Sequence, residues 1–235
     1  MGIAENLKII RERIEKAANR VRRNPEGIRL LAVTKEVDPE RIIEAARCGV
    51  DIFGENYAQE LRDKHDMVEK ALEKKIKWHF IGRLQKNKVK YILGRAELIH
   101  SLDSLSVAEE INKRAGKLGI RVPVLLEINI GGEETKGGIR PEQVEGFLVE
   151  LGRFPHIDVE GFMTMPPLFD DPEMARPYFM QLRGLRDKLS SRFPNLKELS
   201  MGMSGDFEIA IEEGATIVRI GTAIFGPRKE ALAAN

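Results

Sequence analysis

The residue best able to do covalent chemistry is Lys35, which directly follows the aliphatic run 28–34. At the partly dry end of a buried strand, a lysine amine loses its charge more easily, and the neutral amine can add to a carbonyl carbon as a Schiff base. A strand-end lysine can also simply reach into water, and position alone favours that interpretation. Lys35 is therefore a candidate nucleophile that needs support from other residues.

Two glycine-containing segments supply part of that support, because they have the composition of a phosphate-binding site. Ser204 and Gly205 follow a short strand-like run and open a predicted helix, where unpaired main-chain amides can hold a phosphate. Gly221 and Thr222 lie inside the last apolar run and its exit, and a glycine there lets the main chain approach an anion closely. A Ser-Gly pair is also a common plain helix cap, so the segments predict a phosphate site only in combination.

Arg219 lies in the otherwise apolar run 216–225, where a guanidinium cannot remain without a partner. A buried ion pair with a carboxylate and a contact with a ligand are both compatible with this position. Asn56, His79 and the loop residue Lys136 are further polar residues at or near predicted strand ends, although each can be an ordinary structural residue. The four scattered histidines lack the spacing of a zinc site or a catalytic triad, so we expect neither a metal nor hydrolase chemistry.

Distant strand ends must meet if these residues are to act together, and the apolar pattern predicts how. Between Leu7 and Val21, apolar residues recur at steps of three and four, which is typical of an amphipathic helix. Strand-like runs then alternate with helical patterns. The strands are predicted at 28–34, 51–54, 77–81, 97–101, 122–130, 158–164, 197–201 and 216–225. The helices are predicted at 39–48, 56–74, 84–94, 104–118, 141–152, 172–192 and 204–213, with Ser104 and Ser204 as caps.

Strands that alternate with helices predict parallel strands joined by right-handed crossovers. Eight such units in 235 residues suit a single (β/α)8 TIM barrel of α/β class, one domain spanning 1–235, with the extra N-terminal helix outside the repeat. An open doubly wound sheet is the structural alternative. In a barrel, all residues that follow strands share the carboxyl-terminal face, and the loops after strands 7 and 8 often bind phosphate.

The charge balance and the cysteine content narrow the class of protein. The 38 Lys and Arg against 37 Asp and Glu leave a formal charge of +1, which disfavours nucleic acid and membrane surfaces as partners. Cys48 is the one cysteine and cannot form an internal disulfide, and no apolar run approaches the roughly 18 residues of a membrane helix. The start of the chain lacks a signal-peptide pattern, so we expect a cytoplasmic protein. The 32% of charged residues resembles the usage of thermophile proteins.

Five sequence motifs occur in order along the chain. They are Leu31-Ala-Val-Thr-Lys35, Phe53-Gly-Glu-Asn-Tyr57-Ala-Gln-Glu60, Trp78-His-Phe-Ile-Gly82 with Leu84-Gln85 and Asn87-Lys88, Ser200-Met-Gly-Met-Ser204, and Val218-Arg-Ile-Gly-Thr222 with Ile224-Phe-Gly226. Together they resemble the YggS/PROSC family of pyridoxal phosphate homeostasis proteins, and the resemblance spans about residues 3–228.

The resemblance implies a barrel related to the N-terminal barrel of alanine racemases, with pyridoxal 5′-phosphate (PLP) held on Lys35 as a Schiff base. It also implies positions for the other cofactor-binding residues. These are Ser204, Gly205, Gly221 and Thr222 at the phosphate, Arg219 at the pyridine nitrogen, and Asn56 and Met201 beside the ring.

A cation such as Arg219 beside the ring nitrogen disfavours its protonation, which makes the ring a modest electron sink. Alanine racemases also carry a second, β-rich domain with a tyrosine base, and only nine residues follow the last motif here. We therefore expect a monomer or weak dimer that buffers PLP and hands it to apo PLP-dependent enzymes without turnover of its own. An amino-acid racemase of fold type III, with His79, Tyr57 or Lys136 as the second acid/base, is one alternative. A Schiff-base aldolase without PLP is another, but it leaves Arg219 unexplained.

Overall fold

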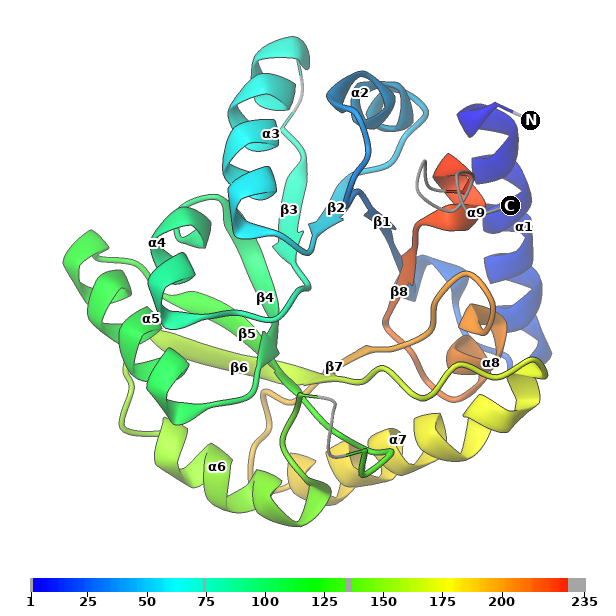
Figure 1. Ribbon diagram of the computed structural model, residues 1–235. Helices are drawn as coiled ribbons and strands as arrows, with labels where there is room; N and C mark the ends of the chain where they lie inside the picture. Colours follow the sequence, from blue (N-terminus) through cyan, green and yellow to red (C-terminus); the bar gives the residue numbers. More distant parts are fainter. Residues whose placement is uncertain (1, 74, 134–136, 228–235) are drawn as a thin grey trace.

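Parallel strands β1 to β8 form a closed barrel in sequence order. In the computed structural model, which describes residues 2–73, 75–133 and 137–227, the barrel closes where β8 pairs with β1 (Figure 1). The strands are β1 (Arg29–Val33), β2 (Ile52–Glu55), β3 (Lys77–Phe80), β4 (Ala96–Leu102), β5 (Val122–Glu127), β6 (Ile157–Met163), β7 (Glu198–Ser200) and β8 (Ile217–Ile220). This closure confirms the predicted (β/α)8 barrel and excludes the open doubly wound sheet.

Helices connect the strands and surround the barrel (Figure 1). They are α1 (Ile3–Arg20), α2 (Pro39–Arg47), α3 (Ala58–Ala71), α4 (Val89–Ile92), α5 (Leu105–Leu118), α6 (Val144–Leu151), α7 (Arg176–Ser190), α8 (Phe207–Glu212) and α9 (Thr222–Phe225). Short 3₁₀ helices cover Pro25–Gly27, Lys86–Lys88, Pro141–Gln143 and Pro172–Ala175. None of the helices in the described ranges combines the length and apolar character that crossing a membrane requires.

The predicted amphipathic helix is α1, which lies outside the repeat and packs against α8 and α9 (Figure 1). Its apolar stripe is buried from Leu7 to Ala18, as the steps of three and four predict. Val21, the last residue of the predicted stripe, follows the helix and is 39% exposed. On its polar side, Arg13 forms an ion pair with Glu208 of α8 at 2.8 Å. Near its start, the Asn6 side chain donates a hydrogen bond to the main-chain oxygen of Ile224 in α9 at 2.9 Å. The extra helix is therefore attached to the last two helices of the barrel.

The strands separate two apolar layers, because successive side chains of a strand point to opposite faces. Leu31 of β1 points into the barrel, whereas its neighbour Ala32 packs with the layer between strands and helices. The interior layer consists of Leu31, Ile52, Ile81, Leu98, Leu125, Met163 and Ile217. The barrel is therefore filled by side chains, and ligands must bind at one of its ends.

The helix predicted at 204–213 begins later than expected, at Phe207. Asp206 is its N-cap residue, so Ser204 lies in the preceding turn and does not cap the helix. The Asp206 carboxylate accepts a hydrogen bond from the main-chain nitrogen of Met203 at 2.6 Å. This bond closes a turn before the helix starts, and the turn displaces the expected cap.

The strand predicted at 216–225 is also shorter than expected. The strand β8 ends at Ile220, and after Gly221 the chain turns into the short helix α9. Ile224 and Phe225 belong to this helix, and their side chains are buried. A short apolar run does not distinguish a strand from a buried helical turn, which explains the difference.

Candidate functional site

A cavity of about 460 Å³ opens at the carboxyl ends of the strands. In a parallel barrel, this face collects the residues that follow each strand. The lining residues are Val33, Lys35, Val37, Asn56, Ile81, Met165, Leu168, Met203, Ser204, Gly205, Arg219, Gly221, Thr222, Phe225 and Gly226. The structure therefore brings together all of the predicted site residues except Met201.

Met201 lies away from the cavity and is fully buried in the layer between strands and helices. Ser200, the last residue of β7, points inward and contacts Arg219, so the next side chain points outward. Gly202 follows with a φ of +90°, and Met203 then lines the cavity instead. Met201, which was expected beside a bound ring, therefore does not line the cavity, and Met203 does. The left-handed glycine between them changes the inward and outward alternation of side chains.

Lys35 lies in a turn directly after β1 and lines the cavity with a partly buried side chain. The turn is unusual, because Glu36 has a φ of +61°, a left-handed conformation that non-glycine residues rarely adopt. Such a conformation costs roughly 1–3 kcal/mol and persists only where neighbouring contacts hold it. The lysine predicted to be a nucleophile is therefore presented from a strained turn at the cavity.

The two segments predicted to bind phosphate lie next to each other at the cavity. The Ser204 hydroxyl accepts a hydrogen bond from the main-chain nitrogen of Ala223, at 3.4 Å, which links the two turns. A Cβ atom on Gly221 would lie 3.3 Å from the Cβ of Val33, so a glycine permits the close approach to β1. Small residues and main-chain groups thus form one side of the cavity, which suits a compact anion.

Arg219 is 4% exposed. Among the described residues, its hydrogen-bond partners are all neutral groups. Its guanidinium donates to the Ser200 hydroxyl at 2.7 Å and to the main-chain oxygen of Thr164 at 2.9 Å. Burial lowers its pKa to about 10, while Asp206 and Glu127 act in the opposite direction at longer range. Within the described chain it forms no ion pair, so the ion-pair interpretation is replaced by a charged group held by neutral acceptors.

A chain of hydrogen bonds continues from Arg219 into the barrel. The Ser200 hydroxyl lies 2.9 Å from Nδ1 of His100, and Nε2 of His100 lies 2.9 Å from Nδ1 of His79. Burial lowers the pKa of His79 to about 3 and the pKa of His100 well below its usual value. Both rings are therefore neutral at pH 7, and we call Arg219, Ser200, His100 and His79 the Arg219 chain.

Sequence reasoning singled out His79 but missed Ser200 and His100 as partners of Arg219. His79 is 3% exposed and belongs to the interior of the barrel, where it is a satisfied structural residue. The signal that could have identified the other two was the presence of a polar residue inside a buried strand. Tyr57, the second acid/base candidate, is 51% exposed and lies outside the cavity lining. Lys136 lies outside the described residues.

Asn56 lines the cavity with a buried side-chain oxygen that has no hydrogen-bond partner in the described part of the chain. A Cβ atom on Gly82 would collide with the main-chain oxygen of Asn56, so the turn after β3 must carry a glycine to pack here. Buried polar atoms are nearly always satisfied, and an unpaired one at a cavity indicates a missing partner. The Asn56 oxygen thus fits a ligand that offers a donor or a bridging water.

Glu127, at the end of β5, is a further residue that sequence reasoning missed. Burial, reinforced by the charge of Asp103, raises its pKa to about 7, against the opposing influence of Arg219 and Arg83. The carboxyl group therefore loses its proton nearer to neutral pH than an ordinary glutamic acid does. An acidic residue that ends the otherwise apolar run of β5 was the available signal.

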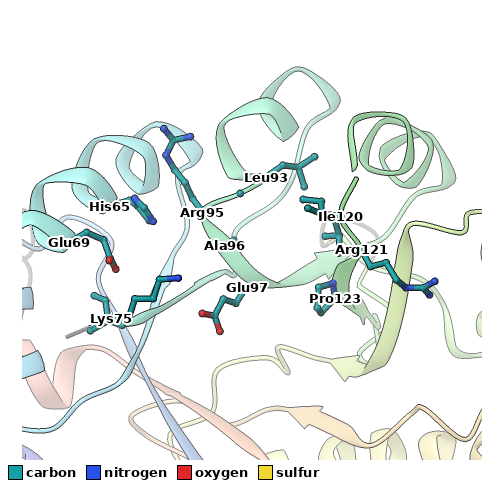
Figure 2. A pocket seen from close by; sticks show the side chains of 13 residues that line it. His65, Glu69, Lys75, Leu93, Arg95, Ala96, Glu97, Ile120, Arg121 and Pro123 are labelled. Carbon is teal, nitrogen blue, oxygen red and sulfur yellow. The ribbon is translucent and has the colours of Figure 1, made fainter. Parts of the chain in front are cut away.

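A second cavity, of about 380 Å³, lies at the opposite end of the barrel, where β3, β4 and β5 begin. Figure 2 shows its lining, in which Lys75, Arg95 and Arg121 are mixed with Glu69 and Glu97. None of the predicted site residues lies there. In parallel barrels this end serves stability, and the mixed charges do not select a ligand of either sign.

Together, the fold and the residues that line the cavity define a (β/α)8-barrel protein with a lysine-bearing cavity at its carboxyl-terminal face. Residues 6–229 match the family model of the alanine racemase N-terminal domain. The chain belongs to this family and, within it, to the YggS/PROSC pyridoxal phosphate homeostasis proteins.

Three relatives show the extent of the similarity. The pyridoxal phosphate homeostasis protein of Aquifex aeolicus is 50% identical over 230 residues, which cover 97% of this chain and 100% of that protein. The protein of the same name from Escherichia coli K12 is 37% identical, and the match covers 96% of this chain and 97% of that one. PipY of Synechococcus elongatus, solved with PLP bound, has a TM-score of 0.83 and 32% identity, over 95% of this chain and 100% of that chain.

Proposed function

We propose that the cavity at the carboxyl-terminal face binds PLP and that the protein carries or buffers this cofactor without turnover of its own. The observation that carries the proposal is that Lys35, Arg219 and the turns around Ser204 and Gly221 line one cavity of about 460 Å³. Small-molecule and cofactor sites commonly have volumes of about 300–1,000 Å³. The names of the relatives and the PLP-bound structure of PipY support the same ligand.

The residues present suit the functional groups of PLP. Ser204, Gly205, Gly221 and Thr222 would hold the phosphate, because their turns adjoin and present small residues to the cavity. Arg219 would face the pyridine nitrogen. Asn56, with its unpaired buried oxygen, would contact the polar edge of the ring directly or through water.

Lys35 would hold the aldehyde end of the cofactor. Its amine, when neutral, would add to the aldehyde carbon, and the carbonyl oxygen would leave as water with the two amine protons, so no oxidant or reductant would be required. The reaction is reversible, and water or another amine can release the aldehyde again. A carrier that must both retain and deliver a reactive aldehyde needs this combination of covalent capture and reversible release.

The side chains around the cavity support carriage rather than catalysis. When bound, PLP supplies an electron-withdrawing ring, which is strongest when its nitrogen is protonated. Arg219 stays charged at neutral pH and has only neutral hydrogen-bond partners among the described residues, so it disfavours that proton. Of the described side chains that line the cavity, Lys35 and Arg219 alone are ionisable. Racemisation needs an acid or base on each face of the substrate, and this lining supplies one.

Reduction with borohydride tests the assignment of the covalent residue. Protein loaded with PLP and then reduced should carry the cofactor on Lys35, as determined by peptide mass spectrometry. The Lys35→Ala variant should lose the visible absorption of the bound cofactor but keep some affinity through the phosphate contacts. An adduct on Lys136 in place of Lys35 would contradict the assignment.

Assays of turnover and transfer test the absence of catalysis. Loaded protein should show no racemase, transaminase or decarboxylase turnover with a panel of amino acids, and it should restore the activity of an apo PLP-dependent enzyme. Conversion of L-alanine to D-alanine that Lys35→Ala abolishes would establish the racemase alternative instead.

A further inference from the structure

One helix contacts the turn that carries Lys35 from outside the cavity. Thr34 is fully buried, and the turn at Glu36 has the left-handed conformation described above. Because such a conformation is unfavourable, other contacts must hold it. Within the turn, the main-chain nitrogen of Val37 donates to the Thr34 oxygen at 3.0 Å. Further contacts come from α3, which packs beside β2 and β3.

Two charged side chains of α3 bind the peptide groups on either side of Lys35. The Lys64 ammonium donates to the main-chain oxygen of Thr34 at 2.7 Å, and the Glu60 carboxylate accepts from the main-chain nitrogen of Glu36 at 3.1 Å. Lys64 and Glu60 lie one helical turn apart and pair with each other at 2.6 Å. One ion pair therefore binds both peptide groups that flank Lys35 and helps to set where its side chain leaves the main chain.

A buried carboxylate anchors this ion pair to the barrel. The Lys64 ammonium also donates to Oε1 of Glu55 at 2.8 Å, and the Thr34 hydroxyl donates to the same oxygen at 2.7 Å. Glu55 is fully buried at the end of β2, and burial raises its pKa although Lys64 and Thr34 oppose the rise. We call Thr34, Glu55, Glu60 and Lys64 the Lys64 cluster.

The composition of the Lys64 cluster is not explained by stability alone. Taking charges out of water is costly, and apolar residues of similar volume often stabilise a core equally well or better. What an ion-pair cluster supplies, and an apolar contact does not, is a defined direction for each hydrogen bond. Here those bonds end on the two peptide groups next to the lysine that lines the cavity.

We propose that Lys64 and Glu60 are positioning residues that hold the amine of Lys35 where it can attack an aldehyde in the cavity. This inference rests on the proposed function. A misplacement of about 1 Å can reduce the rate of a positioned reaction by about a hundredfold. The covalent part of cofactor binding should therefore depend on the Lys64 cluster, whereas the phosphate and ring contacts should not.

Two ligands separate these parts of binding. PLP can react with Lys35, whereas deoxypyridoxine 5′-phosphate has the same ring and phosphate but a methyl group in place of the aldehyde. The full-length protein without cofactor is titrated with each ligand, and the rate at which visible absorption develops with PLP is recorded. The variants are Lys64→Met, Lys64→Arg and Glu60→Gln. Arg62→Met is the matched control, because Arg62 lies on the same helix in an exposed pair with Asp63.

For Lys64→Met we expect the rate of covalent capture and the affinity for PLP to fall by about tenfold or more. The affinity for deoxypyridoxine phosphate should equal that of the parent. Lys64→Arg should recover part of the rate, because it restores a cationic donor. Glu60→Gln should show a smaller loss of the same kind, and Arg62→Met should show none.

Equal losses of affinity for the two ligands would overturn the inference, because they would mean that the cavity as a whole had loosened. Unchanged capture of PLP in Lys64→Met would overturn it as well. Glu60 is partly exposed, so Glu60→Gln decides the question if Lys64→Met does not fold. An absence of covalent capture in the parent protein would contradict the proposed function itself, which is a different outcome from normal capture in both parent and variants.

Discussion

The Lys64 cluster binds the turn of Lys35, and the Arg219 chain begins at Arg219, so each is connected to a residue that lines the cavity. The two surround a buried cation in opposite ways. In the first, the Lys64 ammonium contacts two carboxylates and one main-chain oxygen. In the second, the Arg219 guanidinium contacts a hydroxyl and a main-chain oxygen, and the histidines beyond are neutral. One cation is neutralised by its neighbours, and the other keeps its charge.

The difference indicates two uses of buried charge at one site. A neutralised cation projects little field into the cavity, so its value lies in the directions of its hydrogen bonds. A cation with neutral partners keeps its field and acts on a ligand at a distance. The Lys64 cluster thus sets the geometry of the lysine turn, whereas Arg219 acts through its electric field. The two should respond differently to substitution.

The largest expected effect is on stability when the Lys64 cluster is broken. Lys64→Met should lower the free energy of unfolding by about 3–5 kcal/mol, because the charge of Glu55 is left buried without a counter-charge. The double variant Glu55→Leu with Lys64→Met should regain most of that loss in urea unfolding. A double variant as unstable as Lys64→Met would show that the cluster is not governed by charge pairing.

Arg219→Glu should have the next largest effect, of about 3 kcal/mol on unfolding, because hydrogen bonds from a charged donor are lost and a carboxylate is buried in its place. It should also change the visible spectrum of the loaded protein, since a carboxylate favours a proton on the ring nitrogen. Arg219→Lys, which keeps the charge, is the control. A spectrum and an affinity equal to those of the parent would assign Arg219 a structural role only.

Ser200→Ala should cost about 1–2 kcal/mol in unfolding free energy, because Arg219 and His100 each lose a buried hydrogen-bond partner. Ser190→Ala removes a hydroxyl that bonds a main-chain oxygen at the surface of α7 and should change stability by less than about 0.5 kcal/mol. Thermal or urea unfolding compares the two variants. Equal effects would mean that the Arg219 chain is not held together through Ser200.

The smallest expected effect is a pH dependence that comes from Glu127. Because the folded protein raises the pKa of this carboxyl from its usual 4.5 to about 7, the folded state binds the proton more tightly than the unfolded state. Stability from this group is therefore present at low pH and is lost as pH rises through the window between these values. From about pH 6 to about pH 7 it should fall by about 1 kcal/mol relative to Glu127→Gln. Parallel stability curves for the two proteins would contradict the assignment.

Much of the barrel was predictable from the sequence, because strand and helix periods are local properties of the chain. Parallel strands then place all strand ends on one face, which is why Lys35, Gly205 and Gly221 could be expected to meet. The exchange of Met201 for Met203 was not predictable, since it depends on the left-handed conformation of Gly202.

The buried polar networks were also beyond sequence reasoning. Lys64 is separated by thirty positions from the Thr34 oxygen that it binds, and His100 by one hundred from Ser200. Apolar periodicity predicts which face of a helix or strand is buried. It does not predict which polar atoms form hydrogen bonds within the buried region. Ser204 and Asp206 are both residue types that cap helices well, and the sequence did not show which of them would precede the helix. The bond from Met203 to Asp206 accompanies the later start.

The attachment of α1 to α8 and α9 has a consequence for how the chain reaches its folded state. The Asn6 bond to Ile224 spans 218 positions, and the pair of Arg13 with Glu208 spans 195, so α1 packs against two helices that are synthesised long after it. During synthesis, at about 5–20 residues per second, the apolar stripe of α1 stays without its packing partners until α8 and α9 have been made. The step that closes the ring should therefore be late in folding, and α1 is the segment that a growing chain most needs to keep from aggregating.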